Sequence, residues 1–85
     1  MPSHRRILDE NQPKNIIGPN VRNHRIAKGW SQQHLSNMLE LIPVYICRDS
    51  ISRLEDQLRM VTDFEAAGLA EALGVSIAEL FPGNG

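Results

Sequence analysis

The sequence predicts an all-α domain of five helices, and three kinds of observation lead to this prediction. Two T/S-x-x-E motifs, which begin at Thr62 and Ser76, are typical of helix N-termini, because a hydroxyl at the N-cap precedes a carboxylate by three residues. Apolar residues recur at helical spacing, and glycines stand where such helices would end. The β-branched residues are scattered and hairpin dipeptides are missing, so we expect no strand.

The first helix is predicted to begin at Gly18-Pro19 and to stop at Gly29. Proline is well placed in a first helical turn, where its missing N–H needs no partner, and glycine is common just after a helix end. Ile17 and Val21 are four residues apart and would lie on one face.

The second helix is predicted from Gln32 to about Leu41, with Ser31 as its N-cap. Its apolar face would carry Leu35, Met38 and Leu39. Pro43 ends this helix. The segment that follows, 42–47, is rich in apolar residues, so we expect a long connection that is packed against the domain.

The third helix is predicted from about Arg48 to Asp56, with Ile51 and Leu54 facing inward at i and i+3. Cys47, just before it, is expected to be a buried thiol or a weak cap. The side chains that would face outward are those of Arg48, Asp49, Ser52 and Arg53.

The fourth helix follows the capping box of Thr62 and Glu65 and stops at Gly74. Its apolar stripe is expected to contain Phe64, Leu69 and Leu73. The second box predicts a short fifth helix, Ile77 to Phe81, closed by Pro82-Gly83.

With 85 residues there is room for one domain. We expect a flexible N-terminal arm over residues 1–15, the helical domain over residues 16–82 and a short tail over residues 83–85. Charge is polarised along this chain. Residues 1–30 contain six Lys/Arg against two Asp/Glu, residues 31–61 three against four, and residues 62–85 none against four. A net charge of −1 therefore does not prevent the domain from offering a positive face to phosphate.

Several classes of function lack their sequence signals. The longest apolar run, Leu39 to Cys47, is too short and interrupted for a membrane span, and no apolar signal core follows the N-terminus. The single cysteine fits a reducing compartment, so we expect a cytoplasmic protein. His4, His24 and His34 share no ligand spacing, and no catalytic constellation is visible. We therefore expect no metal, no cofactor and no enzymatic activity.

The order and spacing of three motifs resemble the lambda-repressor-like, Cro/xenobiotic-response-element family of helix-turn-helix transcriptional regulators. The resemblance covers residues 17–82. It rests on Arg25-x-x-x-Gly29-Trp30-Ser31-Gln32-x-x-Leu35, on Ile51-Ser52-Arg53-Leu54-Glu55, and on Leu69-Ala70-x-Ala72-Leu73-Gly74-Val75-Ser76 with Leu80.

This resemblance implies a five-helix DNA-binding fold with an enlarged connection, by roughly five residues around Ile42 to Ile46, between helices two and three. It implies that Gln32 binds a phosphate and that Arg48, Asp49 and Arg53 meet base edges. It also implies a structural ion pair between Arg25 and Glu55.

Two positions depart from the family pattern. An aliphatic residue is usual where His24 stands, which leaves a polar ring to be satisfied beside the core. Glycine is usual where Gln57 stands, just after the recognition helix. Because a left-handed glutamine costs about 1 kcal/mol, we expect that helix to run on or to end differently.

The residues themselves support a DNA-binding surface. Ser31 and Gln32 lie at a predicted helix N-terminus, whose free N–H groups favour a phosphate. Arg48 and Arg53 have the side chain best shaped for guanine in the major groove. Asp49 could accept a hydrogen bond from cytosine, or instead stabilise its own helix or orient Arg48. The other candidates for DNA contact are Gln33, Ser52 and Arg59, the last as a second phosphate contact or as a solvated side chain.

The leading hypothesis is a sequence-specific regulator that binds double-stranded DNA and represses by occupying its operator. Half-sites about 34 Å apart require two copies, so we expect a homodimer. Leu80 and Phe81 would form its seam or, equally, close the monomer core. The alternative hypothesis is an antitoxin or protein-interaction module of the same fold, whose acidic C-terminal half binds a toxin or another regulator.

Overall fold

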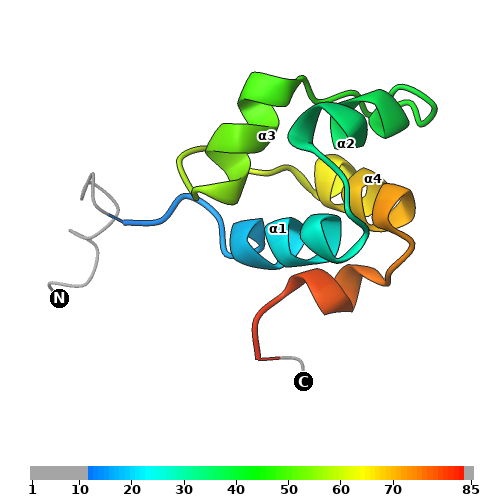
Figure 1. The fold of residues 1–85 in the computed structure, drawn as a ribbon. Coiled ribbons are helices and arrows are strands. Elements are labelled where there is room, and N and C mark those ends of the chain that lie inside the picture. The colour runs from blue at the N-terminus through cyan, green and yellow to red at the C-terminus, as the bar shows by residue number, and fades with distance from the viewer. Residues whose placement is uncertain (1–11, 84–85) are drawn as a thin grey trace, which may run out of the picture.

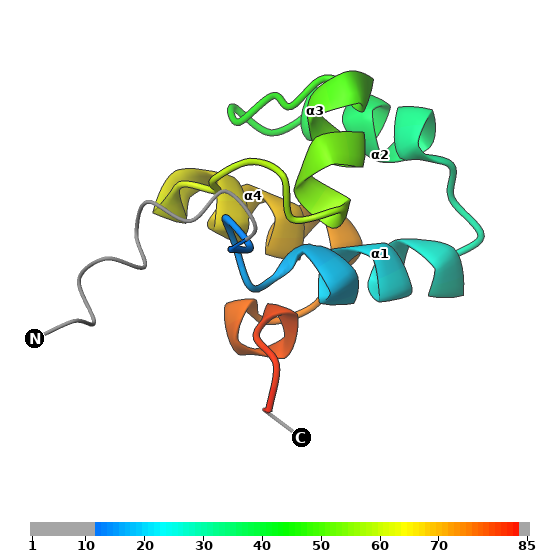
Figure 2. The same cartoon turned by 90° about the vertical axis from the view of Figure 1, so that its left-hand side faces the viewer.

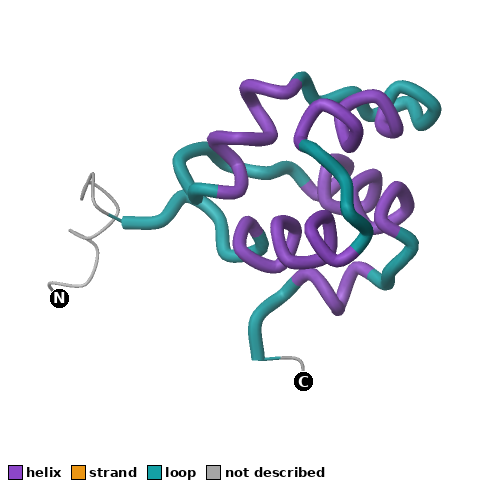
Figure 3. The backbone as a smooth tube through the Cα atoms, in the orientation of Figure 1, coloured by secondary structure: helices purple, strands orange, loops and turns teal. Residues whose placement is uncertain are grey.

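The computed structural model describes residues 12–83, and in this range it is all-helical, without a strand. The α-helices are α1 (Gly18–Ala27), α2 (Gln32–Leu39), α3 (Arg48–Glu55) and α4 (Asp63–Leu73), and η2 (Ile77–Leu80) follows as a 3₁₀ turn. Figure 1 shows α2 and α3 together on one side of the domain, with α1 and α4 beneath them and η2 on the far side. Figure 3 shows short loops between α1 and α2 and between α4 and η2, and longer connections between α2 and α3 and between α3 and α4.

The predicted five-helix count is therefore wrong for this range, which contains four α-helices. The capping box of Ser76 and Glu79 forms as expected, but the segment after it makes only a four-residue 3₁₀ helix. Phe81 is extended, with φ −93° and ψ 141°, because the ring of Pro82 disfavours the helical conformation in the preceding residue.

The N-terminal caps act locally and follow the predicted pattern. Ser31 Oγ accepts a hydrogen bond from the N–H of His34 at the start of α2, and α4 begins with the complete capping box of Thr62 and Glu65. Gly29 and Gly74 both adopt left-handed backbone angles, with φ 73° and 74°. These glycines end α1 and α4 where the sequence predicts.

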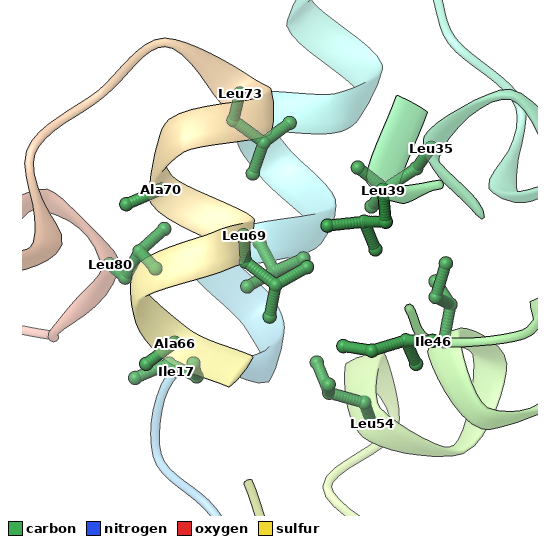
Figure 4. Packing of buried hydrophobic residues seen from close by; sticks show 12 residues of the cluster. Ile17, Leu35, Leu39, Ile46, Leu54, Ala66, Leu69, Ala70, Leu73 and Leu80 are labelled. Carbon is green, nitrogen blue, oxygen red and sulfur yellow. The ribbon is translucent and has the colours of Figure 1, made fainter. Parts of the chain in front are cut away.

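One aliphatic core joins all the helices (Figure 4). It is formed by Ile17, Val21, Leu35, Leu39, Ile46, Ile51, Leu54, Ala66, Leu69, Ala70, Leu73 and Leu80. The side chain of Leu80 is fully buried, so this residue closes the monomer core. Of the two residues expected at a dimer seam, only Phe81 is accessible, with 39% of its surface exposed.

The predicted stripe of α4 is wrong at Phe64, which is 76% exposed. Ala66, Leu69 and Leu73 form the buried stripe instead, at i, i+3 and i+7. Two residues correspond to about 200° of rotation, so Phe64 faces away from the side on which Ala66 is buried.

The connection between α2 and α3 is packed, as predicted, although α2 ends at Leu39 rather than near Leu41. Ile46 is 2% exposed, and Val44 lies against Gly68 of α4. A Cβ at Gly68 would lie 3.0 Å from the Cβ of Val44, so the missing side chain lets the connection approach α4 closely.

The C-terminal end of α3 corrects the expectation for Gln57. This residue adopts the left-handed conformation, with φ 64°. Its N–H donates to the carbonyl of Leu54 at 3.0 Å, and the N–H of Leu58 donates to the carbonyl of Arg53 at 2.8 Å. This is the Schellman arrangement that glycine normally completes.

Residues of the predicted N-terminal arm hold this helix end in place. The N–H of Lys14 donates to the carbonyl of Gln57 at 3.0 Å, and Gln57 Nε2 donates to the carbonyl of Asn15 at 3.0 Å. Asn15 Nδ2 also donates to the carbonyls of Leu54 and Arg59. The last part of the predicted arm is thus bonded to the domain, and residues 1–11 lie outside the described range.

Candidate nucleic-acid interface

Helices α2 and α3 pack against each other, and each has one buried and one outward side. Leu35 and Leu39 of α2 and Ile51 and Leu54 of α3 are fully buried. The opposite side of α3 lies on the outside of the molecule in both Figure 1 and Figure 2. In the described part of the chain, no helix is long and apolar enough to cross a membrane.

The outward side of α3 carries two exposed guanidinium groups. The side chain of Arg48 is 56% exposed, and its Nη2 lies 3.3 Å from Oδ1 of Asp49, itself 82% exposed. Arg53 is exposed and has no salt bridge among residues 12–83. Ser52 is half-buried between them. Both arginines therefore remain available to an external ligand, while Asp49 is positioned to orient Arg48.

At the N-terminus of α2, two of the three predicted DNA-binding residues are exposed and one is bonded inside the protein. Ser31 is exposed and caps the helix, and Gln33 is exposed with its Nε2 donating to Oδ1 of Asn37 at 2.9 Å. Gln32, which the resemblance assigns to a phosphate, turns inward instead, and its Nε2 donates to Glu55 Oε1 at 3.0 Å. The side chain of Gln32 is thus occupied by the protein, and Asn37 joins the exposed polar surface of α2.

Arg25 and Glu55 form the ion pair that the resemblance implies. The carboxylate of Glu55 is fully buried and accepts bonds from Arg25 Nε at 2.7 Å and Arg25 Nη2 at 2.9 Å. Arg25 Nη1 also donates to the carbonyl of Trp30 at 2.7 Å. The pair therefore joins α1, the turn before α2 and the end of α3.

Arg22 extends this network to the surface. Its Nε lies 3.3 Å from Glu55 Oε1, and its Nη2 lies 2.6 Å from Asp56 Oδ1. The hydrogen bonds to Asp56 and Glu55 raise the pKa of Arg22. Three side chains therefore donate to the carboxylate of Glu55 and hold the C-terminal end of α3 in place. They are those of Arg22, Arg25 and Gln32.

The expectation of a phosphate contact at Arg59 is not supported by its surroundings. Its Nη1 and Nη2 donate to the two carboxylate oxygens of Glu65 at 3.2 and 3.1 Å. A guanidinium bonded to both oxygens of a carboxylate has little free charge for DNA. Arg59 instead stabilises the capping box at the start of α4.

Burial of the Glu65 carboxyl by itself raises its pKa. The bonds from Arg59 and from the backbone N–H of Thr62 outweigh that effect, so the pKa of Glu65 is lowered below its ordinary value. The Glu65 carboxylate of the capping box is therefore charged at neutral pH.

Two further polar side chains near α3 were not predicted as site residues. Tyr45 is 55% exposed, and its hydroxyl lies 3.3 Å from Ser36 Oγ. Cys47 is exposed at the N-cap of α3, where we expected a buried thiol or a weak cap, and its side chain makes no capping bond. A hydrogen bond with the Ser50 hydroxyl lowers the pKa of the Cys47 thiol. In the structure, exposed Tyr45 and Cys47 flank buried Ile46, as in an extended segment, but the uniformly apolar sequence from Val44 to Cys47 carries no signal of this alternation.

His24 lies at the edge of the core. Its Nε2 lies 3.4 Å from the carbonyl oxygen of Glu79, which satisfies the polar ring. Among residues 12–83 no group of three or more His, Cys, Asp or Glu side chains is arranged to hold a metal ion.

The fold is shared with a protein whose structure is known. No family model matches the chain, and no curated protein matches it. The crystal structure of the hypothetical transcription factor NHTF from Neisseria superposes with a TM-score of 0.69 and 27% sequence identity, over 86% of this chain and 78% of that chain. The chain therefore has a transcription-factor-like, all-helical fold, that of the Neisseria protein.

Proposed function

We propose that the chain is a sequence-specific regulator that binds double-stranded DNA with α3 in the major groove. The observation that carries the proposal is the position of Arg48 and Arg53, which are exposed along the outward side of α3. The C-terminal end of this helix is held by the ion pair of Glu55 with Arg25. In the major groove, the bidentate contact of an arginine side chain distinguishes guanine from the other bases. The likeness to a hypothetical transcription factor adds support.

The backbone at the start of α2 would contribute a phosphate anchor. Its free N–H groups and the exposed hydroxyl of Ser31 suit an anion, as helix N-termini do generally. Gln33 and Asn37 would extend this contact along α2. Arg48, Asp49, Ser52 and Arg53 would face the bases, with Asp49 acting through Arg48.

The mode of action that we propose is repression by operator occupancy, with binding rather than catalysis as the whole activity. A pseudo-palindromic operator presents half-sites about 34 Å apart, which one α3 cannot span. The regulator would therefore act as a homodimer.

The test is selection from randomised duplex DNA, followed by fluorescence anisotropy on the selected duplex over a salt series. Affinity should fall steeply with salt, because phosphate contacts release counterions. Arg48→Lys and Arg53→Lys serve as matched variants that keep the charge but lose the bidentate geometry. Each should lose roughly 1–3 kcal/mol of discrimination while the salt dependence persists. The absence of any sequence preference in the unmodified chain would contradict the proposal.

A further inference from the structure

Tyr45 is an exposed aromatic residue in the connection between α2 and α3 (Figure 3), and a buried side chain holds its hydroxyl. That side chain belongs to Ser36 of α2, which is fully buried and whose Oγ donates to the hydroxyl oxygen of Tyr45 at 3.3 Å. A tyrosine hydroxyl can accept and donate at the same time. Within residues 12–83 the Tyr45 hydroxyl has no other hydrogen-bond partner, so its own proton is available to an external acceptor.

The backbone of the connection places Tyr45 on the same side as the start of α3. Val44 lies against α4, and Ile46 is buried in the core. Tyr45 and Cys47 are exposed. In an extended segment alternate side chains point the same way, so Tyr45 shares the outward side of the connection with Cys47, the N-cap of α3. Tyr45 therefore lies beside the first turn of α3.

Distance determines which part of the DNA Tyr45 can reach when α3 lies in the major groove. Two residues of extended chain span about 7 Å, and the major groove is about 12 Å wide. A side chain about 7 Å from the start of a helix centred in the groove lies at the edge of the groove, where the phosphates are, and not over the bases. Tyrosine is among the side chains that bind phosphate oxygens in protein–DNA complexes.

We infer that Tyr45 binds a phosphate of the DNA backbone through its hydroxyl, and that Ser36 is the positioning residue of this contact. The inference rests on the proposed function and extends its DNA-binding surface to the connection between α2 and α3. The contact is uncharged on the protein side and carries no sequence information, so it anchors α3 in the groove without reading a base.

The first test compares Tyr45→Phe with the unmodified chain by fluorescence anisotropy on the selected duplex. The variant keeps the ring and loses only the hydroxyl, so affinity should fall roughly three- to tenfold. The salt dependence should not change, because a neutral donor releases no counterion, and the order of preference among sequences should stay the same. Phe64→Leu alters an exposed ring of α4, outside α2, α3 and their connection, and should bind like the unmodified chain.

Single methylphosphonates in the selected duplex locate the contact, because each replaces one charged phosphate oxygen with a methyl group. At one phosphate in each half-site, the substitution should cost the unmodified chain more affinity than it costs Tyr45→Phe, by the factor that the hydroxyl contributes. At every other phosphate the two proteins should lose affinity equally.

Ser36→Ala tests the positioning role. Affinity should fall less than for Tyr45→Phe, since the tyrosine hydroxyl is still present but is no longer held. In the double variant the loss should equal that of Tyr45→Phe alone, because Ser36 then has no hydroxyl to position. Thermal unfolding of each variant verifies that the domain still folds.

Several results would overturn the inference. Unchanged affinity of Tyr45→Phe shows that the hydroxyl does not bind DNA, and a changed preference among sequences shows that the side chain meets bases instead. A loss without a specific methylphosphonate position shows an indirect effect, and additive losses in the double variant show that Ser36 does not act through Tyr45. In all these cases the unmodified chain still binds the selected duplex, so the proposed function stands. A chain that selects and binds no duplex overturns both.

Discussion

Glu55 is completely enclosed, yet both of its carboxylate oxygens accept hydrogen bonds from the single guanidinium of Arg25, at 2.7 and 2.9 Å. This arrangement ties the last turn of α3 to α1. It also explains how α3, a helix of only eight residues, is held in place with Arg48 and Arg53 exposed. Removal of the Arg25 cation should cost more free energy of unfolding than the intact pair contributes, because the buried carboxylate of Glu55 is left with fewer partners.

Arg25→Ala should therefore lower the free energy of unfolding by roughly 3 kcal/mol, even though Arg22 and Gln32 still contact Glu55. Urea denaturation monitored by circular dichroism measures the change. Arg53→Ala is the matched control, since an exposed arginine without a salt bridge in the described range should contribute less than about 0.5 kcal/mol. Equal losses for the two variants would mean that the buried and outward sides of α3 have been assigned the wrong way round.

A second prediction concerns Asn15, whose side chain joins the ends of two helices. Its Nδ2 donates to the carbonyls of Leu54 and Arg59 at 3.1 and 2.8 Å, and its Oδ1 accepts from the N–H of Gly18 at 2.8 Å. Asn15→Ala should cost about 2 kcal/mol of stability, because it removes the acceptor at the N-terminus of α1 and the side-chain donor to two carbonyls, of which that of Leu54 keeps the N–H of Gln57.

The same denaturation experiment on Asn23→Ala provides the control. Asn23 is exposed in the middle of α1, where alanine is the better helix former, so stability should be unchanged or slightly higher. A loss at Asn15 no larger than at Asn23 would show that residues 14–15 behave as the free arm first expected.

Stability should also depend on pH through Glu65. Its pKa is lowered in the folded state, since the bonds from Arg59 and Thr62 outweigh the effect of burial. Because the folded-state pKa is lowered, ionised Glu65 stabilises the folded protein at pH values above 4.5, the ordinary pKa of the carboxyl. This contribution is lost as the pH falls through the folded-state pKa. Glu65→Gln keeps an acceptor for the capping box but removes the charge.

The melting temperature of the unmodified chain should exceed that of Glu65→Gln at neutral pH, and the difference should disappear on acidification below pH 4.5. Glu71→Gln is the comparison, since its exposed carboxylate on the same helix has no salt bridge within residues 12–83. A difference for Glu65→Gln that is constant with pH would exclude the charged contact with Arg59 as its source.

Local interactions explain what could be predicted from the sequence. The caps at Ser31, Thr62 and Ser76 and the left-handed glycines depend on residues within three or four positions, so the motifs locate the helix ends well. The early end of η2 also has a local cause in Pro82, but a capping box alone does not distinguish a 3₁₀ helix from an α-helix.

Tertiary contacts explain the rest. The resemblance implies a phosphate contact for Gln32, but the partner of this side chain in the structure, Glu55, lies 23 positions away and can be recognised only when α2 and α3 pack together. Gln57 adopts a conformation that favours glycine because Lys14 and Asn15, more than 40 positions earlier in sequence, bond to it. The exposure of Phe64 has a local cause instead, because the position of this residue in the helical phase of α4 excludes it from the buried side that contains Leu69 and Leu73.

The last prediction uses the single cysteine as a probe of the proposed DNA contact. Cys47 is exposed at the N-cap of α3, and the hydrogen bond with Ser50 lowers its pKa, so more of the reactive thiolate is present near neutral pH. Iodoacetamide should therefore modify it readily in the free protein. The first turn of a recognition helix reaches deepest into the major groove, so a saturating selected duplex should slow alkylation severalfold, as measured by mass spectrometry. The same duplex at a salt concentration that dissociates the complex should give no protection, which separates burial by DNA from any direct effect of DNA on the reagent. Full reactivity of Cys47 in a complex shown by anisotropy to be saturated would mean that DNA binds elsewhere on the domain, because α3 cannot insert its N-terminal turn into a groove while leaving that thiol open to solvent.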